Sequence, residues 1–166
     1  MTIKQIENPI EKAVIAKQIL DDLSEWFGIP ESTENYIEQS KEIPFLACLA
    51  NEQPVGFMAL KQTSTDTAEI FVIGILKAFH RRGIGSKLYA EFENMAKARG
   101  FSYLQVKTVK LGVYDEYDIT NNFYKAIDFK ALECFPDMWN KPNPCQIYVK
   151  YIGLNEAGTE KNFAFS

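Results

Sequence analysis

The sequence predicts one α+β domain built on a mixed, mostly antiparallel sheet of six to seven strands. Short apolar runs separated by polar turns recur in the first half of the chain and again near its end, which is typical of antiparallel strands. Between them, an apolar run ending at Leu76 passes through a glycine-containing turn into an amphipathic segment and then into an expected strand at Tyr103–Val109. Strand, helix and strand in this order form a right-handed crossover, so these two strands are expected to run parallel.

Length and composition limit the class of protein. The chain has 166 residues, of which 46% are hydrophobic and 24% charged, and these values are typical of one globular domain with a buried core. We expect the domain to span residues 1–153 and the polar stretch 154–166 to be a tail that is partly disordered or packed onto a neighbour. The net charge of −4 argues against a general nucleic-acid binder. Because the apolar segments are shorter than a membrane span, we expect no membrane partner either.

Cysteine usage and the N-terminal segment favour a cytoplasmic protein. Cys48, Cys134 and Cys145 lack the spacing of a metal site or a disulfide framework, so we expect reduced thiols. His80 is the only histidine of the sequence, and no metal site is expected. The segment Met1–Pro9 lacks the apolar core of a secretory signal.

Hydrophobic periodicity and turn residues predict the remaining elements. Asn8-Pro9 is typical of a helix start, and apolar residues recur at helical spacing over Ile10–Phe27. Further helices are expected over Ser32–Ser40, Ser86–Arg99 and about Ile119–Ile127. Strands are expected over Thr2–Glu7, Pro44–Ala50, Val55–Lys61, Ala68–Leu76, Tyr103–Val109, Phe129–Phe135 and Gln146–Ile152, with a long proline-containing loop over Pro136–Pro144.

The stretch Ile70–Gly85 predicts an anion-binding site. An apolar strand passes through two arginines and two glycines into a helix, whose first N–H groups and dipole attract an anion. Two common phosphate loops do not fit here. Leu88 stands where the dinucleotide fingerprint needs a third small residue, and Ser86-Lys87 reverses the order that the P-loop requires. These mismatches disfavour a nucleotide-binding protein, and an ordinary strand-to-helix turn is the alternative for the loop alone.

Two motifs within this order of elements resemble the GCN5-related N-acetyltransferase (GNAT) family, over nearly the whole domain. The segment His80-Arg81-Arg82-Gly83-Ile84-Gly85 is similar to the family's acyl-CoA loop, Gln/Arg-x-x-Gly-x-Gly/Ala, with His80 in place of the usual Gln or Arg. The segment Phe123–Phe129 resembles the family's Phe-Tyr-x-x-x-Gly-Phe, with Asp128 in place of the glycine. The family often has an asparagine seven residues before the tyrosine, where this chain has Tyr117.

The resemblance implies the GNAT fold and transfer of an acetyl group from acetyl-CoA, a co-substrate used without a metal, to a primary amine by direct attack. It implies that Tyr124 protonates the leaving thiolate as general acid; a half-buried core tyrosine is the alternative. A non-catalytic acyl-CoA-binding or sensor domain on the same fold is the alternative function. The resemblance implies that the strand backbone at Ile73 and Ile75 contacts the pantetheine arm of CoA. The further implied CoA-binding residues are His80, Arg81, Arg82, Gly83, Ile84, Gly85, Ser86 and Tyr117.

The general base is a separate question. Alternation along the expected strand places Glu69 on one face with Ile73 and Ile75, which makes Glu69 a candidate base. A solvated glutamate at the start of a strand explains the residue equally well. Asp115 and Glu116 are alternatives of lower weight.

Charge near the expected acceptor side favours a cationic amine. In this family the first two helices and the loop Gly112–Asp118 would line that side. The expected partner is a small-molecule or peptide amine, such as a polyamine, an aminoglycoside or a lysine side chain; a solvated helix face is the alternative reading of the charge. Many members of the family are dimers through their last strands, and the sequence leaves a homodimer open. The acidic residues concerned are Asp21, Asp22, Glu25, Glu31 and Glu34.

Overall fold

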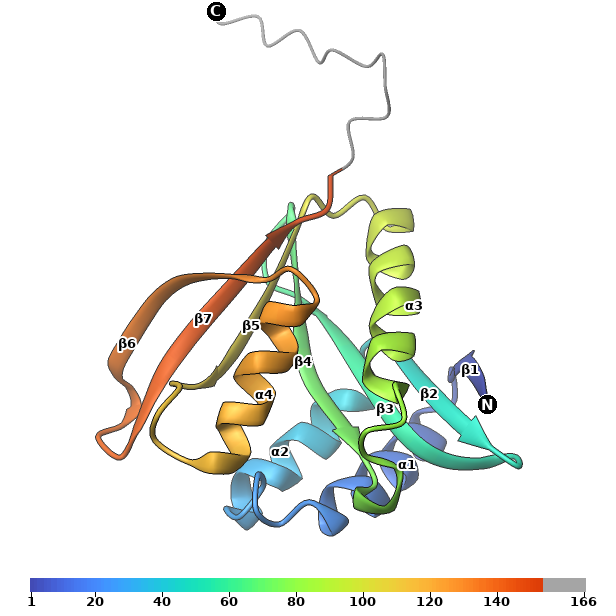
Figure 1. The fold of residues 1–166 in the computed structure, drawn as a ribbon. Coiled ribbons are helices and arrows are strands. Elements are labelled where there is room, and N and C mark those ends of the chain that lie inside the picture. Colours follow the sequence, from blue (N-terminus) through green and yellow to red (C-terminus); the bar gives the residue numbers. More distant parts are fainter. Residues whose placement is uncertain (154–166) are drawn as a thin grey trace, which may run out of the picture.

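The computed structural model describes residues 1–153 and contains a seven-stranded sheet with helices on both faces (Figure 1). The strand order is β1-β2-β3-β4-β5-β7-β6; β4 and β5 run parallel and the other neighbours antiparallel. This mixed sheet confirms the predicted fold class. The expected tail, 154–166, lies outside the described residues. The elements are β1 (Thr2–Gln5), α1 (Pro9–Asp22), α2 (Pro30–Ser40), β2 (Phe45–Ala50), β3 (Gln53–Gln62), β4 (Thr67–Ile75), a 3-10 turn (Lys77–Phe79), α3 (Ile84–Ala98), β5 (Tyr103–Val109), α4 (Asp115–Ala126), β6 (Lys130–Asn140) and β7 (Asn143–Tyr151).

The sheet divides the hydrophobic core into two clusters. On one face, α3 buries Leu88 and Phe92 completely against the strands, and α4 adds Tyr124. On the other face, α1 buries Ile15 and Ile19. Full burial of each large apolar side chain contributes about 1.5–3 kcal/mol, so both clusters hold the helices firmly on the sheet. None of the helices in residues 1–153 is long and apolar enough to cross a membrane.

The start of α1 follows the predicted cap, but its end does not follow the prediction. The Asn8 side-chain oxygen accepts a hydrogen bond from the Glu11 N–H at 3.0 Å, and Pro9 occupies the first turn. The helix ends at Asp22 rather than at Phe27. Residues 23–29 therefore form a connection to α2 that is free to reach other parts of the fold.

A β-bulge in β4 breaks the alternation of its side chains. Val72 pairs with Ala59, whereas Ile70 pairs with the next residue of β3, so Phe71 is an extra residue on β4. Before the bulge, Ile70 belongs to the core cluster beneath α3. Beyond it, Val72 belongs to the opposite cluster, beneath α1. Counting by two along β4 therefore assigns the wrong face to residues on one side of the bulge.

The parallel strands β4 and β5 pair at their beginnings and then separate. Their register covers Thr67–Glu69 against Tyr103–Gln105, and Figure 1 shows the two strands diverging from this common start. Beyond it, β5 continues beside β7 as far as Val109. The later part of β4 therefore presents backbone N–H and C=O groups on the side facing β5 that are not taken up by that strand.

Helix α4 begins earlier than predicted. It starts at Asp115 rather than near Ile119, so three acidic side chains lie in its first turn. Acidic residues there interact favourably with the positive end of the helix dipole. The tyrosine- and acid-rich stretch expected as a loop is therefore mostly the start of this helix.

The prediction of a long proline-containing loop over Pro136–Pro144 is wrong. Most of it belongs to the hairpin β6–β7, whose last register pair is Asn140 with Asn143. Strand β6 is an edge strand, and its register is irregular between Phe135 and Asn140. Proline is tolerated in such an edge because no ladder hydrogen bond depends on its missing N–H.

Candidate active site

The turn before α3 has the backbone geometry of an anion site. Arg81 and Gly83 have positive φ angles of 61° and 76°. Helix α3 begins at Ile84, and among the described residues its N-cap makes no side-chain hydrogen bond. The Lys87 N–H donates to the Gly83 carbonyl as the first helical bond, so the N–H groups of residues 84–86 precede that ladder. Unbonded N–H groups together with the helix dipole attract phosphate, which supports the predicted role of this loop.

Gly85 brings the start of α3 into contact with α4. A Cβ atom at position 85 would lie 3.1 Å from Cε2 and 3.2 Å from Cζ of Phe123. Phe123 precedes Tyr124 on α4, and the two rings pack with centroids 5.5 Å apart. The Phe123 ring therefore packs against both Gly85 in the anion loop and Tyr124, the candidate acid.

His80 connects the same loop to the end of β4. Its Nε2–H donates to the Ile75 carbonyl oxygen at 2.6 Å. Its ring also makes an edge contact with Trp26, with centroids 5.9 Å apart. The resemblance implies a CoA contact for His80, and in the structure its side chain links the loop to the end of β4.

The backbone of Ile73 and Ile75 faces the side of β4 that β5 leaves. The Leu76 N–H donates to the Val55 carbonyl on β3 at 2.9 Å. Backbone groups of successive strand residues point to opposite sides. Ile73 and Ile75 therefore direct their N–H and C=O groups away from β3. The Ile75 carbonyl already accepts from His80, so the two groups of Ile73 and the N–H of Ile75 are those that support the predicted pairing with an amide-containing ligand.

Tyr124 lies in an aromatic cluster on α4 and is 3% exposed. Its ring centroid lies 6.0 Å from that of Phe129 and 6.2 Å from that of Tyr148. Burial raises the pKa of Tyr124 above its ordinary value of 10, and the nearby Tyr117 adds to the effect. The phenol is therefore protonated at neutral pH and available as a proton donor.

Asn121 fixes the position of α4 on the sheet. This fully buried amide donates to the carbonyls of Val109, at 2.8 Å, and Tyr117, at 2.7 Å. Its Oδ1 accepts from the Tyr148 hydroxyl at 2.6 Å. The two buried bonds, to Val109 on β5 and Tyr148 on β7, attach the helix that carries Tyr124 to the sheet.

Glu69 lies on the opposite face of the sheet from Ile73 and Ile75, so the prediction that they share a face is wrong. The bulge at Phe71 is the physical reason. Glu69 is 5% exposed, and its Oε1 accepts from Gln105 Nε2 at 3.2 Å. Lys107 Nζ also lies 3.2 Å from Oε1. Both contacts engage the same oxygen, so within the described chain Oε2 remains available to a ligand.

Glu69 lines a pocket of about 560 Å³ on the α2 face of the sheet. Helix α2 contributes polar side chains, β3 contributes Lys61, β4 adds Phe71, β5 adds Lys107 and the edge strand adds Trp139. This pocket includes the point where β4 and β5 stop pairing. The pocket therefore borders the start of the unpaired edge of β4.

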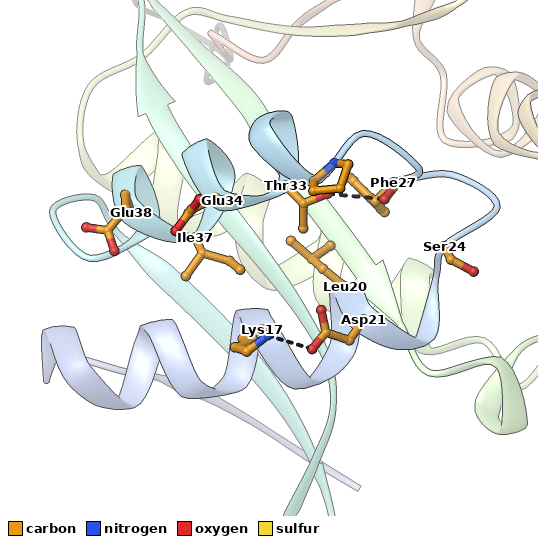
Figure 2. A pocket seen from close by; sticks show the side chains of 10 residues that line it. Lys17, Leu20, Asp21, Ser24, Phe27, Thr33, Glu34, Ile37 and Glu38 are labelled. Carbon is orange, nitrogen blue, oxygen red and sulfur yellow. Dashed lines mark hydrogen bonds and ion pairs between the residues drawn. The ribbon is translucent and has the colours of Figure 1, made fainter.

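The acidic residues expected on the acceptor side are divided between different places. Of the five, Glu31 is the one that lines this pocket within residues 1–153. Asp21 and Glu34 line a separate groove of about 500 Å³ between α1 and α2 (Figure 2). There Asp21 pairs with Lys17 at 2.8 Å. The expectation that the acidic helices together attract the acceptor is therefore not supported by their placement.

The other two acidic residues hold the turn after β4. Asp22 accepts from the backbone N–H of Lys77 at 2.7 Å, and Glu25 pairs with the Lys77 ammonium at 2.9 Å. The end of α1 is thereby attached to the segment that leads into the anion loop.

The segment 112–118 is bound to the α1–α2 connection and is not part of the pocket lining. Trp26 Nε1 donates to the Glu116 carbonyl at 3.1 Å. The Tyr117 hydroxyl donates to the Trp26 carbonyl at 2.6 Å, and burial raises the pKa of Tyr117 to about 12. The Tyr117 hydroxyl, predicted to contact CoA, therefore already has a protein acceptor.

Sequence reasoning missed three residues that the structure places at or beside the site: Trp26, Lys61 and Lys107. Helical periodicity over Ile10–Phe27 assigned Trp26 to a helix, whereas α1 ends at Asp22. The two lysines carry no local motif, and only sheet register brings them beside Glu69. In the part of the chain that the structure describes, no group of three or more His, Cys, Asp or Glu side chains has the arrangement of a metal site.

Comparisons with known proteins agree with this geometry. The chain matches the acetyltransferase (GNAT) family over residues 16–129. Curated protein sequences give no match. Similar solved structures include a GNAT-family protein from Desulfovibrio desulfuricans, with 16% identity, a TM-score of 0.80, and coverage of 91% of this chain and 98% of that chain. The aminoglycoside 6'-N-acetyltransferase from Enterococcus faecium has 19% identity, a TM-score of 0.70, and coverage of 92% and 97%.

A GNAT acetyltransferase from Elizabethkingia anophelis with acetyl-CoA bound has 15% identity, a TM-score of 0.65, and coverage of 90% of this chain and 97% of that chain. At these identities the structures share the fold with this protein. The family match itself covers well over half of the chain. The chain therefore belongs to the GNAT acetyltransferase family.

Proposed function

We propose that this protein transfers an acetyl group from acetyl-CoA to the primary amine of a small acceptor. Family membership supports acetyl transfer, and a structural neighbour holds acetyl-CoA. One observation carries the proposal for this chain. Where β4 leaves β5, the unpaired strand edge and a buried, protonated Tyr124 lie on one side, and the carboxylate of Glu69 lies on the other.

The residues of this chain fit acetyl-CoA at two places. The N–H groups of residues 84–86, with Arg81 and Arg82 beside them, hold the pyrophosphate. The backbone of Ile73 and Ile75 binds the amides of the pantetheine arm. When bound, acetyl-CoA supplies an activated thioester. A strand N–H directed at the thioester oxygen stabilises the negative charge that develops there.

The two ionisable side chains divide the proton transfers. Glu69 accepts a proton from the acceptor ammonium through Oε2, directly or by way of a water molecule. The freed lone pair forms the new C–N bond as the C–S bond breaks. Tyr124 donates its phenolic proton to the departing sulfur, which avoids leaving a thiolate in a site sheltered from water. The attacking nitrogen then loses the second proton that the amide does not retain, and transfer of this proton to the Tyr124 phenolate, directly or through water, restores the phenol. Positioning of the two reactants by the strand edge and the pocket accounts for much of the remaining rate gain.

The replacement Tyr124→Phe tests the proposal. Removal of the hydroxyl is expected to lower kcat by about 10²–10⁴-fold, the usual contribution of a positioned general acid. Thiol release measures turnover, and the shift in Tm on adding CoA measures binding, which should persist. Tyr103→Phe, at a 45% exposed tyrosine on β5, is the matched control.

Two results would contradict the proposal. Unchanged turnover in Tyr124→Phe would eliminate this tyrosine as the acid. Tight acetyl-CoA binding by the unmodified protein without thiol release, across a broad panel of amines, would favour the non-catalytic acyl-CoA sensor instead.

A further inference from the structure

A row of charged and polar side chains crosses the sheet at the pocket. Lys61 on β3 is the register partner of Glu69 on β4, and Glu69 is the register partner of Gln105 on β5. Register partners project from the same face of a sheet. Lys107, two residues beyond Gln105, lies on that face as well and lines the same pocket. The pocket therefore contains cations on both sides of its buried carboxylate, and α2 adds a second carboxylate, Glu31, to its lining.

These two lysines differ in their partners. Lys107 forms an ion pair with Glu69 at 3.2 Å. Lys61 Nζ instead donates to Gln39 Oε1 at 2.9 Å and lies 4.9 Å from the centroid of the Phe71 ring. Among the ion pairs of residues 1–153, none includes Lys61. The half-buried Lys61 ammonium is therefore held by a neutral amide and an aromatic ring, and within residues 1–153 neither carboxylate of the pocket, Glu31 or Glu69, forms an ion pair with it.

This arrangement disfavours a polycationic acceptor. An acceptor amine at Glu69 has Lys61 directly across the strand pair, so a second ammonium on the acceptor would lie near a fixed positive charge. An anionic group at that end of the acceptor would instead form an ion pair with Lys61. The rings of Phe71 and Tyr36, also in the pocket lining, offer apolar surface to the carbon chain between the two ends.

We propose that the acceptor is a small molecule with a primary amine and an anionic group, a carboxylate or a phosphonate-like group, and that Lys61 binds the anionic group. This inference rests on the proposed function, because it assigns the amine to Glu69. An acceptor of this kind carries one positive and one negative charge, whereas polyamines and aminoglycosides carry several positive charges.

Matched acceptors test this assignment. The series consists of ω-amino acids from β-alanine to ε-aminocaproate, n-alkylamines of the same chain lengths, the corresponding diamines, and ω-aminoalkylphosphonates. Thiol release gives kcat/KM for each. At the best chain length, an anionic acceptor is expected to exceed the alkylamine by about tenfold, the effect of one charge-assisted hydrogen bond. The amino acids and phosphonates distinguish the two sources of negative charge.

Variants of Lys61 assign the preference to this residue. Lys61→Gln is expected to reduce the ratio of kcat/KM between the anionic and neutral acceptors to near one, and Lys61→Arg is expected to restore it. Lys4→Gln removes the same charge from β1, an edge strand that contributes no residue to the pocket, and serves as the control. Equal ratios in the unmodified protein and Lys61→Gln would overturn the inference, as would a preference for diamines.

A binding measurement separates this inference from the proposed function. The acceptors are titrated calorimetrically onto the CoA-saturated protein. Lys61-dependent preference for anionic amines without thiol release would support the inference while contradicting catalysis. Turnover of amines without any such preference would support catalysis and contradict the inference. The absence of a preference in both measurements also overturns it.

Discussion

Replacing Gly85 with alanine tests whether the anion loop and α4 are packed against each other through Phe123. The added Cβ would lie 3.1 Å from the ring, below the 3.4 Å at which ordinary van der Waals contact begins. Alanine gains about 0.5–1 kcal/mol over glycine in a helix, whereas overpacking costs about 1–3 kcal/mol. We expect a net loss of about 1 kcal/mol, which lowers Tm by about 2–4 °C in a domain of this size.

A double-mutant cycle isolates the contact. Phe123→Leu makes room for the new methyl group, so the combined variant should be more stable than the sum of the two single changes predicts. A coupling of about 0.5–3 kcal/mol is typical of residues in contact. Urea unfolding gives the free energies, and thiol release shows whether the displaced ring disturbs the neighbouring Tyr124. We expect kcat to fall in Gly85→Ala and to recover partly in the combined variant.

Gly83→Ala is the matched control for this cycle. Position 83 has open space around it but a φ of +76°, so alanine there costs about 1–2 kcal/mol through backbone strain rather than through a clash. Its effect should add to that of Phe123→Leu without coupling. Additive behaviour of Gly85→Ala and Phe123→Leu would refute the packing argument.

Two further changes probe the acceptor side and the helix α4 contacts. Glu69→Gln is expected to lower kcat/KM by about 10²-fold or more, since a positioned general base contributes on this scale; thiol release at near-unchanged rates would exclude Glu69 as the base. Tyr117→Phe tests the pH dependence of stability. Because the pKa of Tyr117 is raised to about 12 in the folded protein from an ordinary 10, the unfolded chain ionises first; the stabilisation is present below pH 10 and is lost as the pH rises towards 12. The Tm of Tyr117→Phe should decline less steeply over that range, and parallel declines would contradict this assignment.

The features that could be predicted from the sequence are those whose signals are contiguous. The strand ending at Ile75, the turn with Gly83 and the amphipathic helix after it are adjacent, and each has its own periodicity or turn residue. The parallel crossover follows from their order alone. For the same reason the sequence predicts the strand–turn–helix arrangement around Gly83 that the structure contains.

The features that could not be predicted depend on register and on long-range packing. The bulge at Phe71 cannot be recognised from the pattern of apolar and polar residues, because it is defined by the pairing of β4 with β3. His80 acquires a role only when its ring reaches the Ile75 carbonyl. Lys61 becomes part of the pocket only when β3, β4 and α2 are assembled.

The bulge is also what gives the proposed site two sides. With regular alternation, Glu69 and Ile73 would face the same layer of helices. The extra residue at Phe71 moves Glu69 to the α2 face, whereas the side chains of Ile73 and Ile75 pack on the α3 face. In the proposed reaction the acceptor therefore approaches from one face and acetyl-CoA occupies the other. The two reactants meet where β4 and β5 separate, because there the sheet no longer forms a continuous barrier between its faces.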